Sequence, residues 1–117
     1  MVLVDSSVWV DHFRRSDVRL VALLEAGEVL SHPVVIGELA CGPLASRRQT
    51  LEWLHALPKA EEASADEVLA LIERHRLHGT GLGVVDAHLL AAMMLNDVEL
   101  WTRDQALARA ARRLRAT

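Results

Sequence analysis

Three short segments rich in valine and leucine lie along the chain, and each is followed by a segment with helical periodicity. A run of such side chains without polar alternation is typical of a strand that is buried on both faces of a sheet. The segments cover residues 2–5, 28–31 and 98–102, and a weaker candidate covers residues 59–62. The pattern therefore predicts three buried strands and one marginal strand.

Between these segments, apolar residues recur every three or four positions, which is the spacing of one face of an α-helix. Pro33 suits the first turn of a helix, and Gly27 suits the position just after one. Ser64 or Asp66 can cap another helix at its start. The pattern predicts helices over residues 6–15, 17–27, 33–42, 46–56, 64–79, 84–96 and 104–115.

Strands that alternate with helices of this length indicate parallel β-α-β units. We predict an α/β fold of three layers, α/β/α, around a central, mainly parallel sheet of four or five strands. No repeat, linker or shift in composition divides the sequence. We therefore expect residues 1–117 to form a single domain.

The composition narrows the class of protein. Of the 117 residues, 51% are hydrophobic, which favours a folded globular protein over a disordered one. No apolar stretch reaches the roughly 18 residues of a membrane span, and Asp5 and Asp11 interrupt the apolar run that a secretory signal would need. A single cysteine, Cys41, excludes an internal disulfide and fits a reducing cytosol. We expect a cytoplasmic protein without a membrane partner.

The net charge of −3 constrains how the protein could bind nucleic acid. Proteins that bind nucleic acid through their overall charge are usually basic. Binding by this chain would therefore need a local basic patch or a metal ion. Arginines gather near the C-terminus, where they also suit the dipole of the predicted helix, at Arg109, Arg112, Arg113 and Arg115.

Two carboxylates stand at the ends of predicted strands. Asp5 follows the first strand, and Asp104 lies just past the strand that ends at Thr102. Ligands of open parallel sheets bind outside the carboxyl ends of the strands, so we expect both acids at the same edge. Each could instead be an ordinary helix cap, which contributes about 1 kcal/mol. That explanation is weaker for Asp5, because two serines follow it and can cap the helix themselves.

Two further carboxylates are expected on apolar helix faces. Helical spacing places Glu38 beside Val34 and Cys41, and it places Asp86 beside Leu89 and Leu90. Lone carboxylates are rarely buried, since removing an unpaired charge from water costs several kcal/mol. The plain alternative is a buried ion pair, although neither face carries a lysine or an arginine.

A divalent cation bound among the four acids would explain why they come together. Carboxylates that come together repel one another and raise one another's pKa unless a cation lies among them. Oxygen ligands without histidine or cysteine favour a hard ion such as Mg²⁺ or Mn²⁺. Such an ion activates water and binds phosphate oxygens, which would also offset the repulsion between an acidic protein and a nucleic acid. The six histidines do not have the spacing of a zinc site.

Four segments, taken in order, resemble the four acidic motifs of PIN-domain nucleases. They are VLVDSSVWVDHFR, HPVVIGELACG, VVDAHLLAA and WTRD. Within that family the chain is most similar to VapC-type toxins of toxin–antitoxin pairs, and the resemblance spans nearly the whole sequence. Carried over by position, the metal-binding and catalytic acids of the family fall on Asp5, Glu38, Asp86 and Asp104, the hydroxyl beside the first acid on Ser6, and the Thr-x-Asp motif on Thr102 and Asp104.

The resemblance implies an endoribonuclease that depends on Mg²⁺ or Mn²⁺. Attack of a metal-activated water on an RNA phosphodiester would leave a 5′-phosphate and a 3′-hydroxyl. It also implies a cytoplasmic homodimer, tRNA or ribosomal RNA as the substrate, and a cognate antitoxin whose C-terminal segment covers the acidic groove. Many members have one more short strand at the end, so the sheet of this chain is expected to be one strand short.

The residues around the motifs suggest supporting roles. We expect Asp5 to bind the metal ion, Ser6 to orient Asp5 or a bound water molecule, and Ser7 to cap the helix that follows. Arg103 is the basic residue nearest to the proposed site, and it is the candidate for contact with RNA.

Two other functions stay open at this point. A phosphatase with Asp5 as nucleophile would use a similar sheet, but it usually needs a second aspartate where the chain has Ser7. It also usually needs a nearby lysine, whereas the only lysine is Lys59. A non-catalytic RNA- or protein-binding module would keep the scaffold, although it would have no reason to keep four acids.

Overall fold

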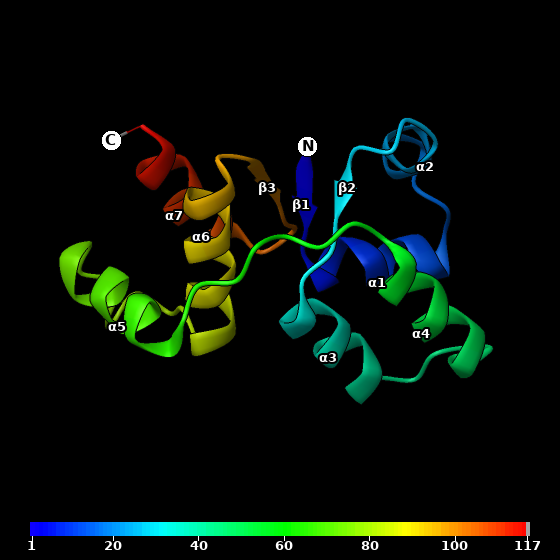
Figure 1. The fold of residues 1–117 in the computed structure, drawn as a ribbon, viewed down its shortest axis with the longest axis horizontal. Helices are drawn as coiled ribbons and strands as arrows, with labels where there is room; N and C mark the ends of the chain where they lie inside the picture. Colours follow the sequence, from blue (N-terminus) through cyan, green and yellow to red (C-terminus); the bar gives the residue numbers. More distant parts are fainter. Residues whose placement is uncertain (117) are drawn as a thin grey trace.

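A parallel sheet lies at the centre of the computed structural model, which describes residues 1–116 (Figure 1). The strands are β1 (Val2–Val4), β2 (Val29–Leu30) and β3 (Glu99–Trp101), in the order β2-β1-β3. Val2 lies opposite Val29 on one side and opposite Glu99 on the other. The first and last strands of the described chain are therefore neighbours in the middle of the molecule.

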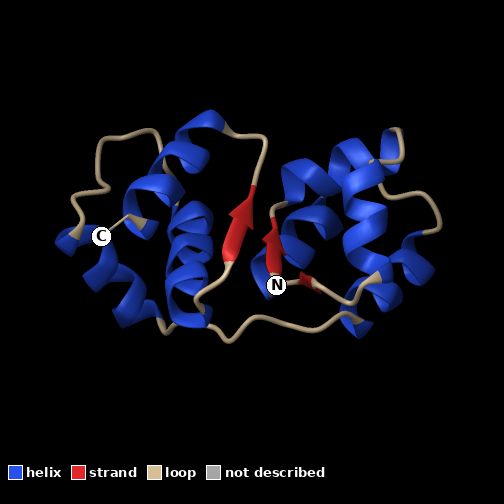
Figure 2. Ribbon diagram, turned by 90° about the horizontal axis from the view of Figure 1, so that it is seen from above, coloured by secondary structure: helices blue, strands red, loops and turns tan. Residues whose placement is uncertain are grey.

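Helices cover the sheet from two sides (Figures 1 and 2). On one side lie α1 (Ser6–Arg14), α2 (Val18–Glu25), α3 (Pro33–Cys41) and α4 (Arg47–Ala56), and on the other lie α5 (Ala65–Arg74), α6 (Val84–Asn96) and α7 (Gln105–Arg115). This is the predicted three-layer α/β/α arrangement. None of the helices in the described part of the chain is long and apolar enough to cross a membrane.

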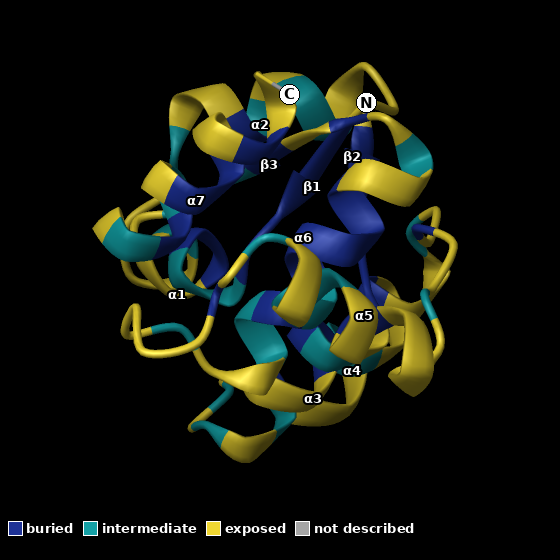
Figure 3. Ribbon diagram, turned by 90° about the vertical axis from the view of Figure 1, so that its left-hand side faces the viewer, coloured by how far each residue is buried: buried dark blue, intermediate teal, exposed yellow. Residues whose placement is uncertain are grey.

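The core lies along both faces of β1, which is buried throughout (Figure 3). Leu3 and Val4 are fully buried, and so are Trp9 of α1 and Leu90 of α6. The central position of β1 explains its sequence, because a strand covered on both faces has no solvent-facing side on which polar residues could alternate.

The predicted strand at residues 59–62 is reduced to a single bridge between Ser31 and Lys59. Immediately afterwards, the Asn96 side chain binds both backbone groups of Glu61. Asn96 Oδ1 accepts the Glu61 N–H at 3.0 Å, and Asn96 Nδ2 donates to the Glu61 carbonyl at 3.0 Å. Because a side chain occupies these groups, the ladder stops there, and the described sheet has three strands instead of four or five.

Residues with positive φ end α2 and α5. They are Gly27 (φ 68°) and Arg76 (φ 52°), and in each case the next amide donates to the carbonyl five positions earlier. The position of Gly27 was predicted, whereas α5 was expected to reach Gly79 and ends at Arg74. The reversal at the end of α5 carries Leu77 into the core, where it is 3% exposed, and this burial accounts for the early stop.

Candidate active site

Asp5 stands at the carboxyl end of β1 and directly precedes α1. It is 6% exposed. Its backbone N–H donates to the carbonyl of Trp101 at 2.9 Å, which ties the end of β1 to the end of β3. The acid after the first strand and the residues after the last strand therefore meet at one edge of the sheet, as predicted from their positions at strand ends.

Two hydroxyl groups hold the Asp5 carboxylate. Ser7 Oγ and Thr102 Oγ1 each donate to Asp5 Oδ2 at 2.7 Å. Ser7 Oγ also accepts the backbone N–H of Arg103 at 2.9 Å, and Thr102 Oγ1 accepts that of Asp104 at 3.0 Å. A chain of hydrogen bonds thus joins Asp5 to the turn that carries Asp104.

The two serines after β1 do not have the contacts expected from the sequence. Ser6 was expected to orient Asp5, but its hydroxyl donates to Glu38 Oε1 at 2.9 Å. Ser7 was expected to cap α1, but it holds Asp5, and α1 has no side-chain cap. The first turn of α1 directs Ser7 back over the end of β1 and Ser6 across to α3. The position of Ser7 two residues after Asp5 was the only sequence signal for its role.

Glu38 reaches this edge from α3, but it is exposed and not buried. The buried face of α3 contains Val35 and Leu39, so it is rotated by about one residue from the predicted face, and Cys41 is exposed as well. The contact that brings Glu38 to this edge is its hydrogen bond from Ser6, which follows Asp5 in the chain. The argument that burial marks Glu38 as a ligand was therefore wrong.

Asp86 lies half-buried in the first turn of α6, where its Oδ2 accepts the Gly83 N–H at 3.1 Å. Burial is the main cause that raises the pKa of Asp86 above its usual value. The bond from Gly83 lowers this pKa, and the negative charges of Asp104 and Asp5 raise it further. Asp104 and Asp5 therefore lie close enough to Asp86 for their charges to disfavour its ionised form.

Asp104 caps α7, since its Oδ1 accepts the Leu107 N–H at 3.0 Å. The ordinary explanation of Asp104 as a helix cap is therefore correct. It leaves room for a second role, because the cap occupies one carboxylate oxygen only.

The four acids share one property. Each keeps a carboxylate oxygen that makes no hydrogen bond to residues 1–116, namely Asp5 Oδ1, Glu38 Oε2, Asp86 Oδ1 and Asp104 Oδ2. Within the same residues none of the four forms an ion pair, whereas Asp11, Asp17 and Glu99 are all paired with arginines. This excludes the buried ion pair as the reason for these acids. Below, the four are called the acidic site.

The acidic site is not a finished metal centre. The described residues contain no group of three or more histidine, cysteine, aspartate or glutamate side chains that could hold a metal ion as they stand. Asp86 and Asp104 are turned toward amides of their own helices. A capping bond contributes about 1 kcal/mol, which is less than the attraction of a partly buried carboxylate to a cation. The donor set itself fits a hard divalent ion, because each acid offers an unbonded oxygen.

Arg103 has contacts of its own. Its Nε lies 3.3 Å from Asp11 Oδ2, one terminal nitrogen lies 2.8 Å from Asp17 Oδ2, and its guanidinium lies 5.6 Å from the ring centroid of Trp101. The pKa of Asp17 is lowered chiefly by the N–H of Leu20 and further by Arg103. Arg103 thus fastens the turn after β3 to α1 and α2, and its contact with RNA stays a prediction.

Known proteins resemble the chain over nearly its whole length. The family model of the PIN domain matches residues 2–113. Ribonuclease VapC32 of Mycobacterium tuberculosis, in the strains CDC 1551 / Oshkosh and H37Rv, is 48% identical over 108 residues, which cover 92% of this chain and 87% of that protein.

A solved structure shares the fold at lower sequence identity. The crystal structure of FitAcB from Neisseria gonorrhoeae superposes with a TM-score of 0.66 and 19% identity, and the match covers 96% of this chain and 94% of that one. The family model spans almost all of the sequence, and a relative shares nearly half of the aligned residues. The chain therefore belongs to the PIN-domain family and, within it, to the VapC type.

Proposed function

We propose that the protein is an endoribonuclease that depends on Mg²⁺ or Mn²⁺ and is the toxin of a toxin–antitoxin pair. The observation that carries this proposal is that Asp5 and Asp104 meet through the hydroxyl of Thr102, and their charges add to the rise in the pKa of Asp86 that burial causes. None of the three acids forms an ion pair within the described chain. VapC32, the relative described above, is a ribonuclease. The proposed substrate is tRNA or ribosomal RNA.

In this proposal the acidic site holds the cation through the unbonded oxygens of Asp5, Glu38, Asp86 and Asp104. A bound ion of this type supplies an activated water and neutralises a phosphate near neutral pH. The protein contributes by positioning the carboxylates that bind the cation. Ser7 and Thr102 keep Asp5 in one orientation, and Ser6 does the same for Glu38. The expected products carry a 5′-phosphate and a 3′-hydroxyl.

The test compares wild type with Asp86→Asn, since asparagine keeps an acceptor for the Gly83 N–H and removes the charge. We expect end-labelled tRNA and ribosomal RNA to be cut with Mg²⁺ or Mn²⁺ and left intact with a chelator. Cleavage by the variant should fall about 100-fold or more. The melting temperature of the metal-free variant at pH 7 should equal or exceed that of wild type, because burial and neighbouring acids disfavour the Asp86 charge.

Asp66→Asn is the matched control, since it makes the same change in the first turn of α5, away from the acidic site. It should cut RNA like wild type. Equal cutting by Asp86→Asn would mean a contaminating ribonuclease or a wrong site. A wild type that binds metal and cuts none of these RNAs would favour the non-catalytic binding module.

The phosphatase alternative fits the geometry less well. The Lys59 side chain donates to the carbonyl of His55 at 2.8 Å, and the Lys59 backbone pairs with Ser31 at the β2 side of the sheet. Thr102, which holds Asp5, lies on the opposite side, after β3. Asp5 is almost buried, and two hydroxyls occupy one of its oxygens. Trapping an aspartyl-phosphate with a phosphate mimic should therefore fail.

A groove beside the acidic site suits the proposed antitoxin. It has a volume of about 470 Å³ and lies between α1, α3 and the turn that leads from α3 into α4. Val10, Phe13, Leu39 and Glu38 are among the residues that line it. The Phe13 ring is 41% exposed and stacks on the buried ring of Trp9, with 5.9 Å between the centroids. An apolar C-terminal segment of an antitoxin placed here would also cover Glu38.

We further propose that residues 1–117 form one domain and that two copies associate in the cytoplasm. A hollow of about 260 Å³ between α5 and α6 is lined by Ala91, Met94, Leu95 and others. Met94 is 40% exposed and Leu95 is 44% exposed, so these two side chains offer apolar surface to a second copy, beside Glu67 at the same hollow.

A further inference from the structure

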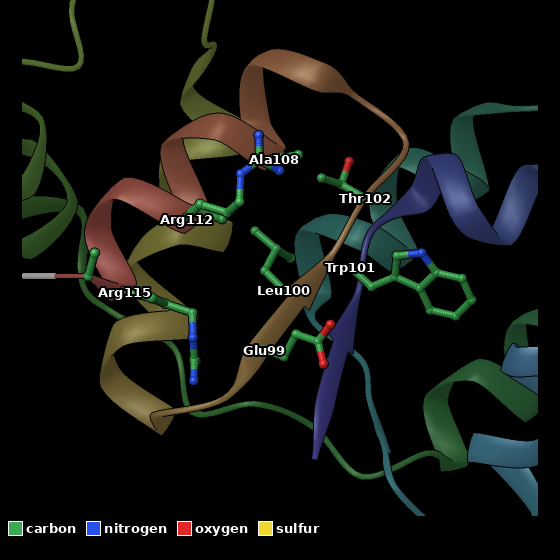
Figure 4. Close-up of a pocket in the computed structure, with 9 residues that line it drawn as sticks. Glu99, Leu100, Trp101, Thr102, Ala108, Arg112 and Arg115 are labelled. Atoms are coloured by element: carbon green, nitrogen blue, oxygen red, sulfur yellow. The ribbon is translucent and has the colours of Figure 1, made fainter.

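We propose that the RNA strand on one side of the cleaved bond lies between β3 and α7, where Arg112 and Arg115 bind its phosphates. This inference rests on the proposed function and adds a path for the substrate. The place is a groove of about 560 Å³ along the outer edge of β3, here called the β3–α7 groove. Leu100 and Thr102 line it from the strand, and Ala108, Arg112 and Arg115 line it from the helix (Figure 4).

One end of the β3–α7 groove lies beside the acidic site. Thr102 lines the groove and also donates to Asp5, while Asp104 begins α7. Along α7, Arg112 and Arg115 follow Asp104 by eight and eleven residues, which at 1.5 Å per residue is roughly 12 and 16 Å. The helix therefore carries positive charge away from the acids in one direction, as successive phosphates of a bound strand require.

Both guanidinium groups are available to an anion. Arg112 and Arg115 are exposed, and neither forms an ion pair within the described chain. Arg115 also donates to the carbonyl of Val98, which fixes its position without neutralising its charge. Glu99 lines the far part of the groove, but its carboxylate is paired with Arg19 at 3.2 Å. The groove is therefore basic although the protein as a whole is acidic.

The lining also favours a single strand over a duplex. Single-stranded nucleic acid is usually bound in a positive groove. In the β3–α7 groove the half-buried side chain of Ala108 adds apolar surface beside the arginines, whereas Leu100 and Ala111 are only 7% and 5% exposed. The Trp101 carbonyl faces β1, where it accepts the Asp5 N–H. Alternation along a strand then turns the backbone N–H and carbonyl of Leu100 outward, where they can bind a 2′-hydroxyl or a base edge.

The test compares two double variants of α7. Arg112→Gln with Arg115→Gln removes both charges of the groove, and Arg109→Gln with Arg113→Gln removes two charges from another flank of the helix. The two changes are matched, because Arg113 donates to the carbonyl of His75 as Arg115 does to that of Val98. Each double variant therefore loses two charges and one bond to a backbone carbonyl.

Binding is measured in the inactive Asp86→Asn background with Mg²⁺ and a labelled single-stranded RNA that wild type cuts. We expect the Arg112/Arg115 double variant to bind about tenfold more weakly. The slope of log affinity against log salt should decrease by about 1.4, from two lost phosphate contacts of about 0.7 each. The Arg109/Arg113 double variant should stay within about twofold of the parent, and its small loss measures the general effect of two charges.

Equal weakening by the two double variants would overturn the groove as the RNA path and leave the nuclease intact. Normal RNA binding by the Arg112/Arg115 variant would overturn it as well. Polyglutamate serves as a second probe, and a variant that binds RNA normally but no longer binds polyglutamate would assign the edge of β3 to an acidic peptide. Failure of the proposed function can be distinguished from these outcomes, because the wild-type protein would then cut no RNA with Mg²⁺ or with Mn²⁺.

Discussion

At the scale of single residues, Thr102 is the point where the hydrogen bonds of the acidic site meet. Its hydroxyl donates to Asp5, accepts from the amide of Asp104, and lies 3.3 Å from the hydroxyl of Ser7. One oxygen atom therefore sets the relative positions of two acids that come from opposite parts of the chain.

Thr102→Val keeps the shape of the side chain and removes both hydrogen bonds. We expect kcat for RNA cleavage to fall roughly 10- to 100-fold with little change in KM, because an acid that binds the cation loses its orientation. Unfolding should become easier by about 1–3 kcal/mol. Thr102→Ser should restore most of the activity.

Thr50→Val makes the same substitution in α4, where the threonine hydroxyl donates to the carbonyl of Ala45. It controls for the general cost of losing a hydroxyl and should cut RNA at the wild-type rate. Full activity in Thr102→Val would show that the orientation of Asp5 does not matter to the reaction.

The sequence could predict where Asp5, Asp86 and Asp104 lie, because strand ends and helix starts fix their places in a parallel fold. It could not predict the contacts of Ser6 or the exposure of Glu38. A helical pattern defines a face only to about one residue, or 100° of rotation, and that uncertainty separates a core position from an exposed one.

At the scale of the elements, His32 joins β2 to α3 in an unusual way. It is fully buried, and its Nδ1 caps α3 by accepting the Val34 N–H at 3.0 Å, while its Nε2 makes no hydrogen bond to the described residues. Burial lowers the pKa of His32, the charge of Glu62 opposes this, and His88 adds to it. The cap requires the neutral ring, because a protonated Nδ1 cannot accept.

This arrangement predicts a loss of stability in weak acid. The unfolded chain binds the proton at the ordinary histidine pKa, about 6.5, and the folded chain binds it only at lower pH. The contribution of His32 is therefore fully present above about pH 6.5 and is lost progressively as the pH falls below it. Urea unfolding of metal-free protein between pH 5 and 8 should show this slope.

His32→Asn isolates the cause, since an asparagine side chain can also accept the Val34 N–H but does not titrate. The variant should lose part of the pH dependence, although it is less stable at pH 7.5 because the smaller side chain leaves a cavity. An unchanged slope in the variant would assign the acid sensitivity to other groups.

Elements with a strong local pattern were predicted to within about two residues, as α6 and β3 demonstrate. The predictions fail where distant residues decide. The Asn96 side chain stops a strand by binding Glu61, which is 35 positions away, and the burial of Leu77 ends α5 early. Such contacts leave no periodic signal in the segment that they change.

At the scale of the whole molecule, we expect a single charge in the hollow between α5 and α6 to separate the proposed homodimer. Leu95→Glu should shift the mass measured by light scattering from two chains toward one, because an ionised carboxylate would be buried against an apolar partner surface. Val18→Glu is the control, since Val18 is 86% exposed on α2, across the sheet from this hollow. A wild type that runs as a single chain would contradict the proposed dimer.

The pairing of β1 with β3 also governs when the acidic site can exist. Asp5 and Thr102 are 97 positions apart, so the bond between them closes only after almost the entire chain is available. A ribosome releases the N-terminal strand first, and pairings of such long range form late in folding. Nascent or C-terminally truncated chains would therefore carry three of the four acids without an assembled site. If the protein is the toxin proposed above, an antitoxin synthesised beforehand is already present before the acidic site can assemble.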